Sequence, residues 1–212
     1  LQSVKATMST AHKCDWISAL HAAGLREIEV ASFVPATLLP QMADAAAVVR
    51  HALTLPGLTV MTLVPNLRGA AAALAAGVHK LTIPVSASAA HSLANVRKTR
   101  QQMVDEVRAI VALRHAQAPQ VQVEVGISTA FGCTLQGAVP EDEVIGLAEQ
   151  LVAAGVDECG LSDTAGMANP AQVRRLFTRL QAAIGPKAGA AHMHNTRGEQ
   201  PVQRHAGGHA HG

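Results

Sequence analysis

One join between a helix and a strand occurs three times in this sequence and constrains its fold more than any other feature. The tripeptide Ala-Ala-Gly ends a helical stretch and precedes a strand-like run at residues 21–25, 74–78 and 152–156. We expect each glycine to adopt the left-handed conformation that commonly ends a helix. Repetition of this join predicts a fold built from βα units around a parallel sheet.

Short apolar runs alternate with longer helical patterns along most of the chain, which predicts an α/β fold. Asn169 followed by Pro170 marks the start of one helix, with an N-cap and a proline in the first turn. We predict strands at 26–33, 58–64, 80–85, 121–128, 158–162 and 188–194. We predict helices at 10–23, 44–53, 67–76, 89–114, 141–154 and 170–184.

Composition excludes several classes of protein. Hydrophobic residues make up 49% of the chain and charged residues 15%, which is typical of a globular domain. A net charge of +2 without a basic cluster argues against nucleic acid as a partner. No apolar run reaches membrane-spanning length, so we expect no membrane partner. Cys14, Cys133 and Cys159 are odd in number and widely spaced, which indicates no disulfide framework and a reducing, cytoplasmic location.

Two βα architectures compete for this pattern. An open doubly wound sheet normally carries Gly-x-Gly-x-x-Gly after its first strand, and the sequence has no such motif. A (β/α)8 TIM barrel instead gathers polar residues at the carboxyl ends of its strands. Polar residues lie within or just after the predicted strands here, and we therefore favour the barrel. They are Glu29, Glu124, Asp163, His192 and His194.

The predicted barrel is incomplete. About six strand–helix units can be counted, whereas the fold needs eight units and about 250 residues. We assign residues 1–198 to a partial TIM-barrel domain. Residues 199–212 show neither a helical nor a strand period, and we expect them to form a disordered tail whose histidines bind metal at most adventitiously.

The run from Gly189 to Thr196 contains the candidate metal ligands. His192 and His194 lie two residues apart in a strand-like segment, so both imidazoles should project to the same side. Two imidazoles placed in this way can bind one divalent ion. Such a pair occurs more often as ordinary core or surface histidines, so the metal site depends on the rest of the sequence.

Carboxylates inside apolar strands are costly unless they are paired or bound. Asp163 ends a strand, where barrel enzymes concentrate catalytic groups, although turn formation or helix capping is an equal alternative. Glu29 is a catalytic candidate whose alternative is an ion pair with a nearby Arg or Lys. We interpret Glu124 as structural. Cys133, in a glycine-punctuated loop, has no histidine close in sequence and is interpreted as a thiol without a function.

Several segments resemble the 3-hydroxy-3-methylglutaryl-CoA lyase family, in that family's order, from Leu1 to about Gly198. Ser-Phe-Val at 32–34 and Pro-Gln-Met-Ala-Asp at 40–44 are the most specific of them. Asp-Thr at 163–164 and the His-x-His pair are shared with the wider group of metal-dependent barrel lyases and synthases. The remaining matches are Ile28-Glu-Val-Ala-Ser-Phe-Val34, Val64-Pro-Asn-Leu-Arg-Gly69, Phe131-Gly-Cys133 and Leu161-Ser-Asp-Thr-Ala-Gly166.

The resemblance implies a carbon–carbon lyase that splits hydroxymethylglutaryl-CoA into acetyl-CoA and acetoacetate, a step of leucine degradation. It implies that His192 and His194 bind Mg²⁺ or Mn²⁺, that Glu29 and Asp163 are acidic active-site residues, and that Lys5 contacts substrate. It also implies a homodimeric parent enzyme. The family has a strand before Leu1 and further strands after Gly198, so the resemblance implies a chain shortened at both ends.

Two alternatives remain open. A related synthase, of the isopropylmalate or homocitrate type, would condense an acyl-CoA with a 2-oxo acid. A non-catalytic remnant is the second alternative, because an unclosed barrel exposes sheet edges and apolar surface. We expect residues 1–212 alone to be poorly soluble, to turn over no substrate and to bind metal weakly.

Overall fold

The computed structural model of this chain describes residues 7–194 and 196. Helices and strands alternate as the sequence predicts, and all six predicted strands form, each within two residues of its predicted ends. The chain divides into two compact units, residues 1–82 with 112–122, and residues 83–111 with 123–212. Lys5 and the tail at 199–212 lie outside the described residues.

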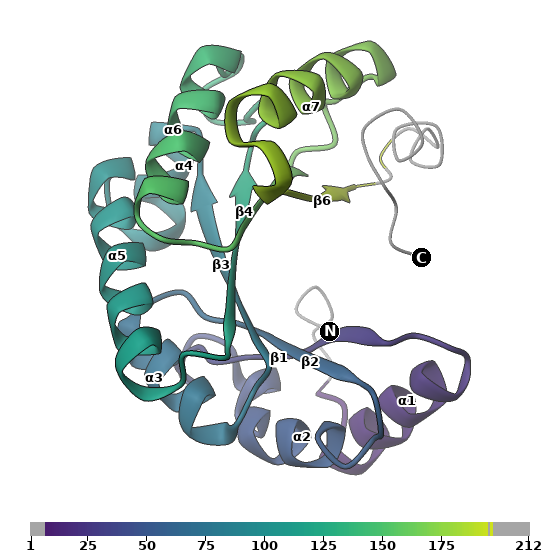
Figure 1. Cartoon of the computed structure of the whole chain (residues 1–212). Helices are drawn as coiled ribbons and strands as arrows, with labels where there is room; N and C mark the ends of the chain where they lie inside the picture. The colour runs from purple at the N-terminus through teal and green to yellow at the C-terminus, as the bar shows by residue number, and fades with distance from the viewer. Residues whose placement is uncertain (1–6, 195, 197–212) are drawn as a thin grey trace. The chain divides into compact units, whose positions relative to one another are not determined.

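The first unit contains two strands, the start of a third, helices α1 to α3 and the end of α5 (Arg100–Gln117). Helices α1 and α2 pack against each other, and α2 also packs against β1 (Figure 1). Strands β1 and β2 pair in parallel, as do β2 and the first residues of β3. The elements are α1 (Thr10–Ala22), β1 (Glu27–Ser32), η1 (Pro40–Met42), α2 (Ala45–Ala52), β2 (Thr59–Leu63), α3 (Leu67–Ala76) and the start of β3 (Lys80–Ser86).

The second unit holds the rest of β3 and the last three strands, in the order β3-β4-β5-β6. Strands β4, β5 and β6 pair in parallel, and helix α7 packs beside α6. Its elements are α4 (Ala89–Val96), most of α5 (Arg100–Gln117), β4 (Gln122–Ser128), α6 (Glu141–Ala153), β5 (Glu158–Asp163), α7 (Pro170–Ile184), η2 (Gly185–Lys187) and β6 (Ala188–Met193).

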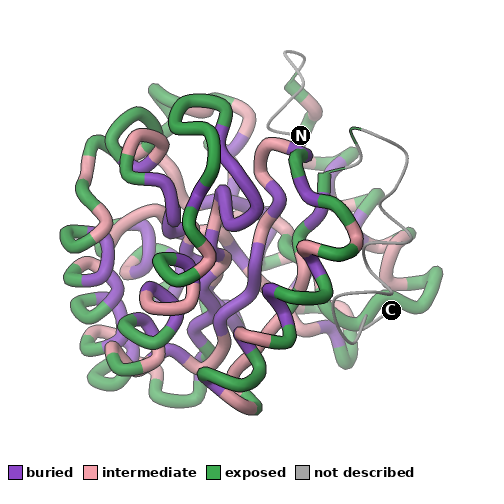
Figure 2. The backbone as a smooth tube through the Cα atoms, turned by 90° about the horizontal axis from the view of Figure 1, so that it is seen from above, coloured by how far each residue is buried: buried purple, intermediate pink, exposed green. Residues whose placement is uncertain are grey.

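Each unit has an aliphatic core, since aromatic residues make up only 2% of the chain. In the second unit, alternate residues of β4 turn toward the helices and are fully buried. Burial follows the strands and the helix faces turned toward them, whereas the outer helix turns are exposed (Figure 2). The core of this unit includes Val104, Val107, Val123, Val125, Ile127, Val144, Leu147, Leu151, Leu161, Leu176 and Leu180.

The three Ala-Ala-Gly joins have the conformation that the sequence predicts. Gly24, Gly77 and Gly155 have φ angles of +103°, +85° and +98°. Each lies one or two residues beyond the end of a helix and leads the chain into the next strand. A side chain at these positions would strain the backbone, which explains why glycine is used at all three joins.

One helix prediction is wrong. The segment 89–114, predicted as a single helix, forms two helices that meet at residues 97–99. Arg97 ends α4 in the left-handed conformation, with φ +56°. Thr99 and Gln102 then form a capping box, since the Gln102 amide donates to the Thr99 hydroxyl and the Thr99 amide donates to the Gln102 side chain. The spacing Thr-x-x-Gln at residues 99–102 is typical of a helix N-terminus and could have indicated the start of α5.

The described helices include none that is both long enough and apolar enough to cross a membrane. The thiols of Cys14, Cys133 and Cys159 are all free, and those of Cys133 and Cys159 are buried. The start of α7 is confirmed, because the Asn169 side chain accepts a hydrogen bond from the Gln172 amide and Pro170 lies in the first turn.

Candidate metal site at the carboxyl end of the last two strands

The carboxyl ends of β5 and β6 lie together in the second unit, because the two strands run parallel. Ser162 pairs with His192 in the register, and Asp163 pairs with Met193. Side chains of paired residues lie on the same face of a sheet. His192 therefore lies on the exposed face with Ser162, whereas Asp163 and Met193 lie on the buried face.

The two candidate ligands converge, as the sequence predicts. The Nε2 atoms of His192 and His194 are 3.2 Å apart, and their ring centroids are 5.2 Å apart. Both side chains are exposed, His192 from the end of β6 and His194 just beyond it. Without a metal, this distance permits one ring nitrogen to donate a proton to the other.

The separation of these two nitrogens fits ligands of one divalent ion. Nitrogens at about 2.1 Å from a metal are about 3.0 Å apart in an octahedral site and about 3.4 Å apart in a tetrahedral one. The observed 3.2 Å lies between the two values. Within the described residues, however, no group of three or more His, Cys, Asp or Glu side chains converges on a common point. Within the described residues the structure therefore brings together two possible ligands, and a complete site would need further ligands from substrate, water or other residues.

Asp163 forms the turn after β5. Its carboxylate is 1% exposed and accepts hydrogen bonds from the amides of Met167, at 2.9 Å, and Ala168, at 3.2 Å. These contacts match the turn-forming alternative that the sequence left open. They also fix the orientation of the carboxylate at the strand end, which is compatible with a second role there.

The other predicted site residues are less informative. Glu29 is exposed on β1 next to a bulge and belongs to the first unit, whereas His192 and His194 belong to the second. Glu124 is 8% exposed and lies opposite Glu158 in the register, nearer the amino ends of β4 and β5 than their carboxyl ends, which agrees with a structural role. Lys5 is outside the described residues.

The loop after β4 carries Cys133, which is buried. Burial raises the pKa of this thiol, but polar contacts with the Ser88 side chain and with the amides of Leu135 and Gln136 outweigh burial and lower the pKa below its ordinary value. The loop closes on itself through two backbone hydrogen bonds between Cys133 and Gly137. The glycine-punctuated loop is thus a folded turn with its own polar contacts.

Two features at these strand ends were missed from the sequence. The hydroxyl of Ser86, at the end of β3, lies 2.6 Å from Nδ1 of His91 in α4, and burial lowers the pKa of His91. Thr129 follows β4 with φ +57° and is 1% exposed. The Ser-to-His spacing across a strand–helix junction could have indicated the first pair. No sequence signal indicates a left-handed threonine.

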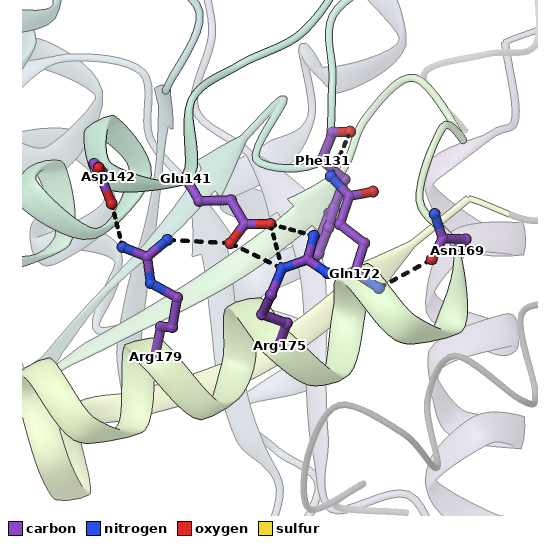
Figure 3. A network of polar contacts seen from close by, with 7 residues as sticks. All are labelled: Phe131, Glu141, Asp142, Asn169, Gln172, Arg175 and Arg179. Carbon is purple, nitrogen blue, oxygen red and sulfur yellow. Dashed lines mark hydrogen bonds and ion pairs between the residues drawn. The ribbon is translucent and has the colours of Figure 1, made fainter.

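Helix α7 is held to the start of α6 by ion pairs, and to the loop after β4 by a side chain (Figure 3). Arg175 binds both carboxylate oxygens of Glu141, and Arg179 bridges Glu141 and Asp142. Gln172, one turn earlier in α7, donates to the carbonyl oxygen of Phe131 at 3.2 Å. The loop after β4 is thus held by α7, and α7 is held in turn by the start of α6.

The sequence and the structure are both similar to known lyases. The chain is 35% identical over 198 residues to hydroxymethylglutaryl-CoA lyase YngG of Bacillus subtilis, covering 93% of this chain and 66% of that protein. The crystal structure of hydroxymethylglutaryl-CoA lyase from Pseudomonas aeruginosa superposes with a TM-score of 0.90 at 32% identity, covering 97% of this chain and 68% of that one. An HMG-CoA lyase from Acinetobacter baumannii, in complex with coenzyme A and 3-methylmalate, gives a TM-score of 0.89 at 32% identity, covering 98% and 68%.

These matches confirm the predicted fold class, an incomplete (β/α)8 barrel. The chain spans about two thirds of the length of these relatives. The family model described as HMGL-like matches residues 1–200, which include all six strands and the two converging imidazoles. The chain belongs to the HMGL-like family.

Proposed function

We propose that this chain is the larger part of a divalent-metal-dependent lyase that cleaves 3-hydroxy-3-methylglutaryl-CoA to acetyl-CoA and acetoacetate. The observation that carries this proposal is the convergence of the His192 and His194 Nε2 atoms at 3.2 Å. Their place at the carboxyl end of a barrel strand supports it, since barrel enzymes hold their active sites there. Similarity to lyases of this name supports the choice of substrate.

The residues of this chain have distinct parts in the proposed reaction. His192 and His194 would hold Mg²⁺ or Mn²⁺, which when bound supplies a Lewis acid that lowers the pKa of the tertiary hydroxyl of the substrate. We assign the acid–base work to Glu29 and Asp163, and substrate contact to Lys5. The base takes the hydroxyl proton, the bond between the carbinol carbon and the CoA-bearing fragment breaks, and the resulting acetyl-CoA enolate is protonated on carbon.

Asp163 lies at the strand end beside Met193, on the buried face opposite His192. Two backbone hydrogen bonds hold its carboxylate there, and each oxygen keeps a further lone pair. A part in proton transfer would therefore require the turn at 163–168 to rearrange when substrate binds. We further propose that the whole enzyme is a homodimer and that it works in the cytosol, where its buried free thiols would stay reduced.

The test is an assay for acetoacetate, coupled to NADH oxidation by 3-hydroxybutyrate dehydrogenase, with Mn²⁺ and hydroxymethylglutaryl-CoA. The purified chain and the same coding region extended at both ends are measured side by side. Mn²⁺-dependent acetoacetate release that disappears in His192→Ala but persists in His115→Ala is expected from the extended protein. His115 is an exposed histidine on α5 and serves as the matched control.

The assay also separates the two alternatives. Release of free CoA from acetyl-CoA and a 2-oxo acid, without acetoacetate from hydroxymethylglutaryl-CoA, would assign the protein to the condensing synthases. Absence of both activities from the extended protein would leave a non-catalytic remnant. Turnover by residues 1–212 alone would contradict the expected inactivity of the short chain.

A further inference from the structure

Thr129 has a backbone conformation that a β-branched residue seldom adopts. Its φ is +57°, directly after the last residue of β4, and its side chain is 1% exposed. Left-handed backbone is unfavourable for a residue with a Cβ, and a β-branched residue is a clear outlier there. Such a conformation persists only where the surrounding contacts require it, and outliers of this kind gather at functional sites.

The contacts that hold Thr129 come from the two neighbouring strand ends. Its amide donates to the hydroxyl of Thr164, just after β5, at 2.9 Å. Its own hydroxyl accepts from the amide of Ser88, the N-cap of α4 after β3, at 3.1 Å, and donates to the carbonyl of Ser128. One residue therefore joins the chain segments that follow β3, β4 and β5.

Further bonds continue from these segments into the loop at 130–137. The Ala130 amide donates to the Ser162 carbonyl at 3.2 Å, and the Ser88 hydroxyl donates to Gln136 at 2.9 Å. On the other side, Gln172 holds the Phe131 carbonyl. The Met167 sulfur lies 3.0 Å from the place a Cβ would occupy on Gly132, so the turn after β5 packs against the loop.

We propose that Thr129 is a positioning residue that fixes the segments after β3, β4 and β5 as one rigid rim at the carboxyl ends of these strands. The assignment rests on the proposed function in one respect, because that function places the acyl-CoA at this edge. The peptide plane at the end of β4 directs the Thr129 amide toward Thr164, and the left-handed φ then places the Thr129 hydroxyl at the Ser88 amide. In an extended conformation the side chain would point elsewhere and lose the contact with Ser88.

The three cysteines provide a readout of this role that requires no activity. Cys133 is buried in the loop, so its reaction with a thiol reagent needs the loop to open. Cys159 is fully buried in β5, where burial raises its pKa to about 12, so its reaction reports opening of the core. Cys14 is partly exposed on α1 and calibrates the reagent.

Alkylation of each cysteine is followed by peptide mass spectrometry in four variants of the full chain. Thr129→Val keeps the shape and the β-branch but removes the hydroxyl, which leaves the buried Ser88 amide without its acceptor. It is expected to speed Cys133 alkylation about tenfold or more while Cys159 stays unreactive. Thr129→Ser restores the hydroxyl and should return the Cys133 rate to within about twofold of the parent chain.

Two further variants make the test decisive. Thr164→Val removes the acceptor of the Thr129 amide and should also speed Cys133, which covers the case in which Thr129→Val does not fold. Thr178→Val removes an exposed hydroxyl on α7 that bonds only its own helix, and should change nothing. An unchanged Cys133 rate in both Thr129→Val and Thr164→Val, or equal acceleration of Cys133 and Cys159, would overturn the proposal.

The result is separable from the proposed lyase activity. If Thr129→Val speeds Cys133 alkylation and the extended protein releases no acetoacetate, the lyase proposal is rejected and the proposal for Thr129 stands. In an active extended protein, Thr129→Val is expected to raise KM for the acyl-CoA more than it lowers kcat, because it loosens a binding rim without removing a reacting group. A fall in kcat at constant KM would contradict the positioning role.

Discussion

The buried Lys13–Asp44 ion pair makes a sharp prediction about stability in the first unit. Lys13 lies on α1, and its Nζ donates to Asp44 Oδ1 at 2.6 Å and to the Gln41 carbonyl. The second carboxylate oxygen of Asp44 accepts from the Thr10 hydroxyl at 2.7 Å. The pair thereby ties α1 to the segment that precedes α2.

The expected loss of stability differs between variants of the two residues, because Lys13 is more deeply buried than Asp44. The Lys13 side chain is 4% exposed and the Asp44 side chain 23%. Removing the partner of a buried charge costs about 3–5 kcal/mol, because the remaining charge cannot be hydrated. Asp44→Asn leaves the ammonium of Lys13 in that position and should lower the free energy of unfolding by about 3 kcal/mol. Lys13→Met leaves a carboxylate that water and Thr10 still reach, and should cost about 1–2 kcal/mol.

Urea unfolding of the two single variants and the double variant, followed by circular dichroism at pH 7, measures these costs. The double variant Lys13→Met/Asp44→Asn should be more stable than Asp44→Asn alone, because no buried charge is left unpaired. A loss below about 0.5 kcal/mol in Asp44→Asn, or costs that simply add in the double variant, would refute the reasoning from burial.

Three further predictions concern single positions. Arg97→Asn should raise the free energy of unfolding by about 0.5–1 kcal/mol in urea, because asparagine tolerates the left-handed conformation that Arg97 adopts; an unchanged midpoint would contradict this. Gly160→Ala should destabilise by more than about 2 kcal/mol in the same assay, since its Cβ would lie 2.4 Å from the backbone oxygen of Ala190; a fully stable variant would show that the β5–β6 pairing differs. Hydrogen bonds from Arg175 lower the pKa of Glu141 in the folded protein. The stability that this pair adds is therefore complete above the unfolded-state pKa of about 4.3 and is lost as the pH falls through the lower folded-state pKa. Glu141→Gln should remove this loss at acid pH, and an unchanged profile of the urea midpoint against pH would contradict the prediction.

Much of the fold could be predicted from the sequence because local chemistry and the global fold agree. The glycine joins, the Asn169 cap and the apolar runs each specify one local structure, and the strands formed where predicted. The prediction of one long helix at 89–114 was wrong because apolar residues keep a helical spacing across the junction at residues 97–99. The break depends on a left-handed Arg97, which side-chain chemistry does not favour.

Several motifs on which the family resemblance rests have structural roles in this chain. Asp44 of the Pro-Gln-Met-Ala-Asp segment is the partner of buried Lys13. Asn66 caps α3 by accepting from the Gly69 amide, and a Cβ on Gly69 would lie 2.5 Å from the Phe33 carbonyl oxygen. A sequence motif can therefore mark a family through its packing as readily as through its chemistry.

The candidate site was only partly predictable. The His192–His194 pair follows from strand period alone, since residues two apart share a face. The bonds of Asp163 to its own turn and the Ser86–His91 pair depend on loop conformation, and the strained Thr129 depends on contacts with the neighbouring strand ends. Those contacts are set by register and loop conformation, which a single sequence does not specify.

The central claim is that His192 and His194 together bind a divalent ion. Isothermal titration of Mn²⁺ tests it most directly, in the parent chain, in His192→Ala, and in a variant with His205, His209 and His211 of the tail replaced by alanine. Binding that weakens at least about tenfold in His192→Ala and survives the tail substitutions is the predicted result. Binding that persists in His192→Ala and disappears with the tail histidines would contradict the claim.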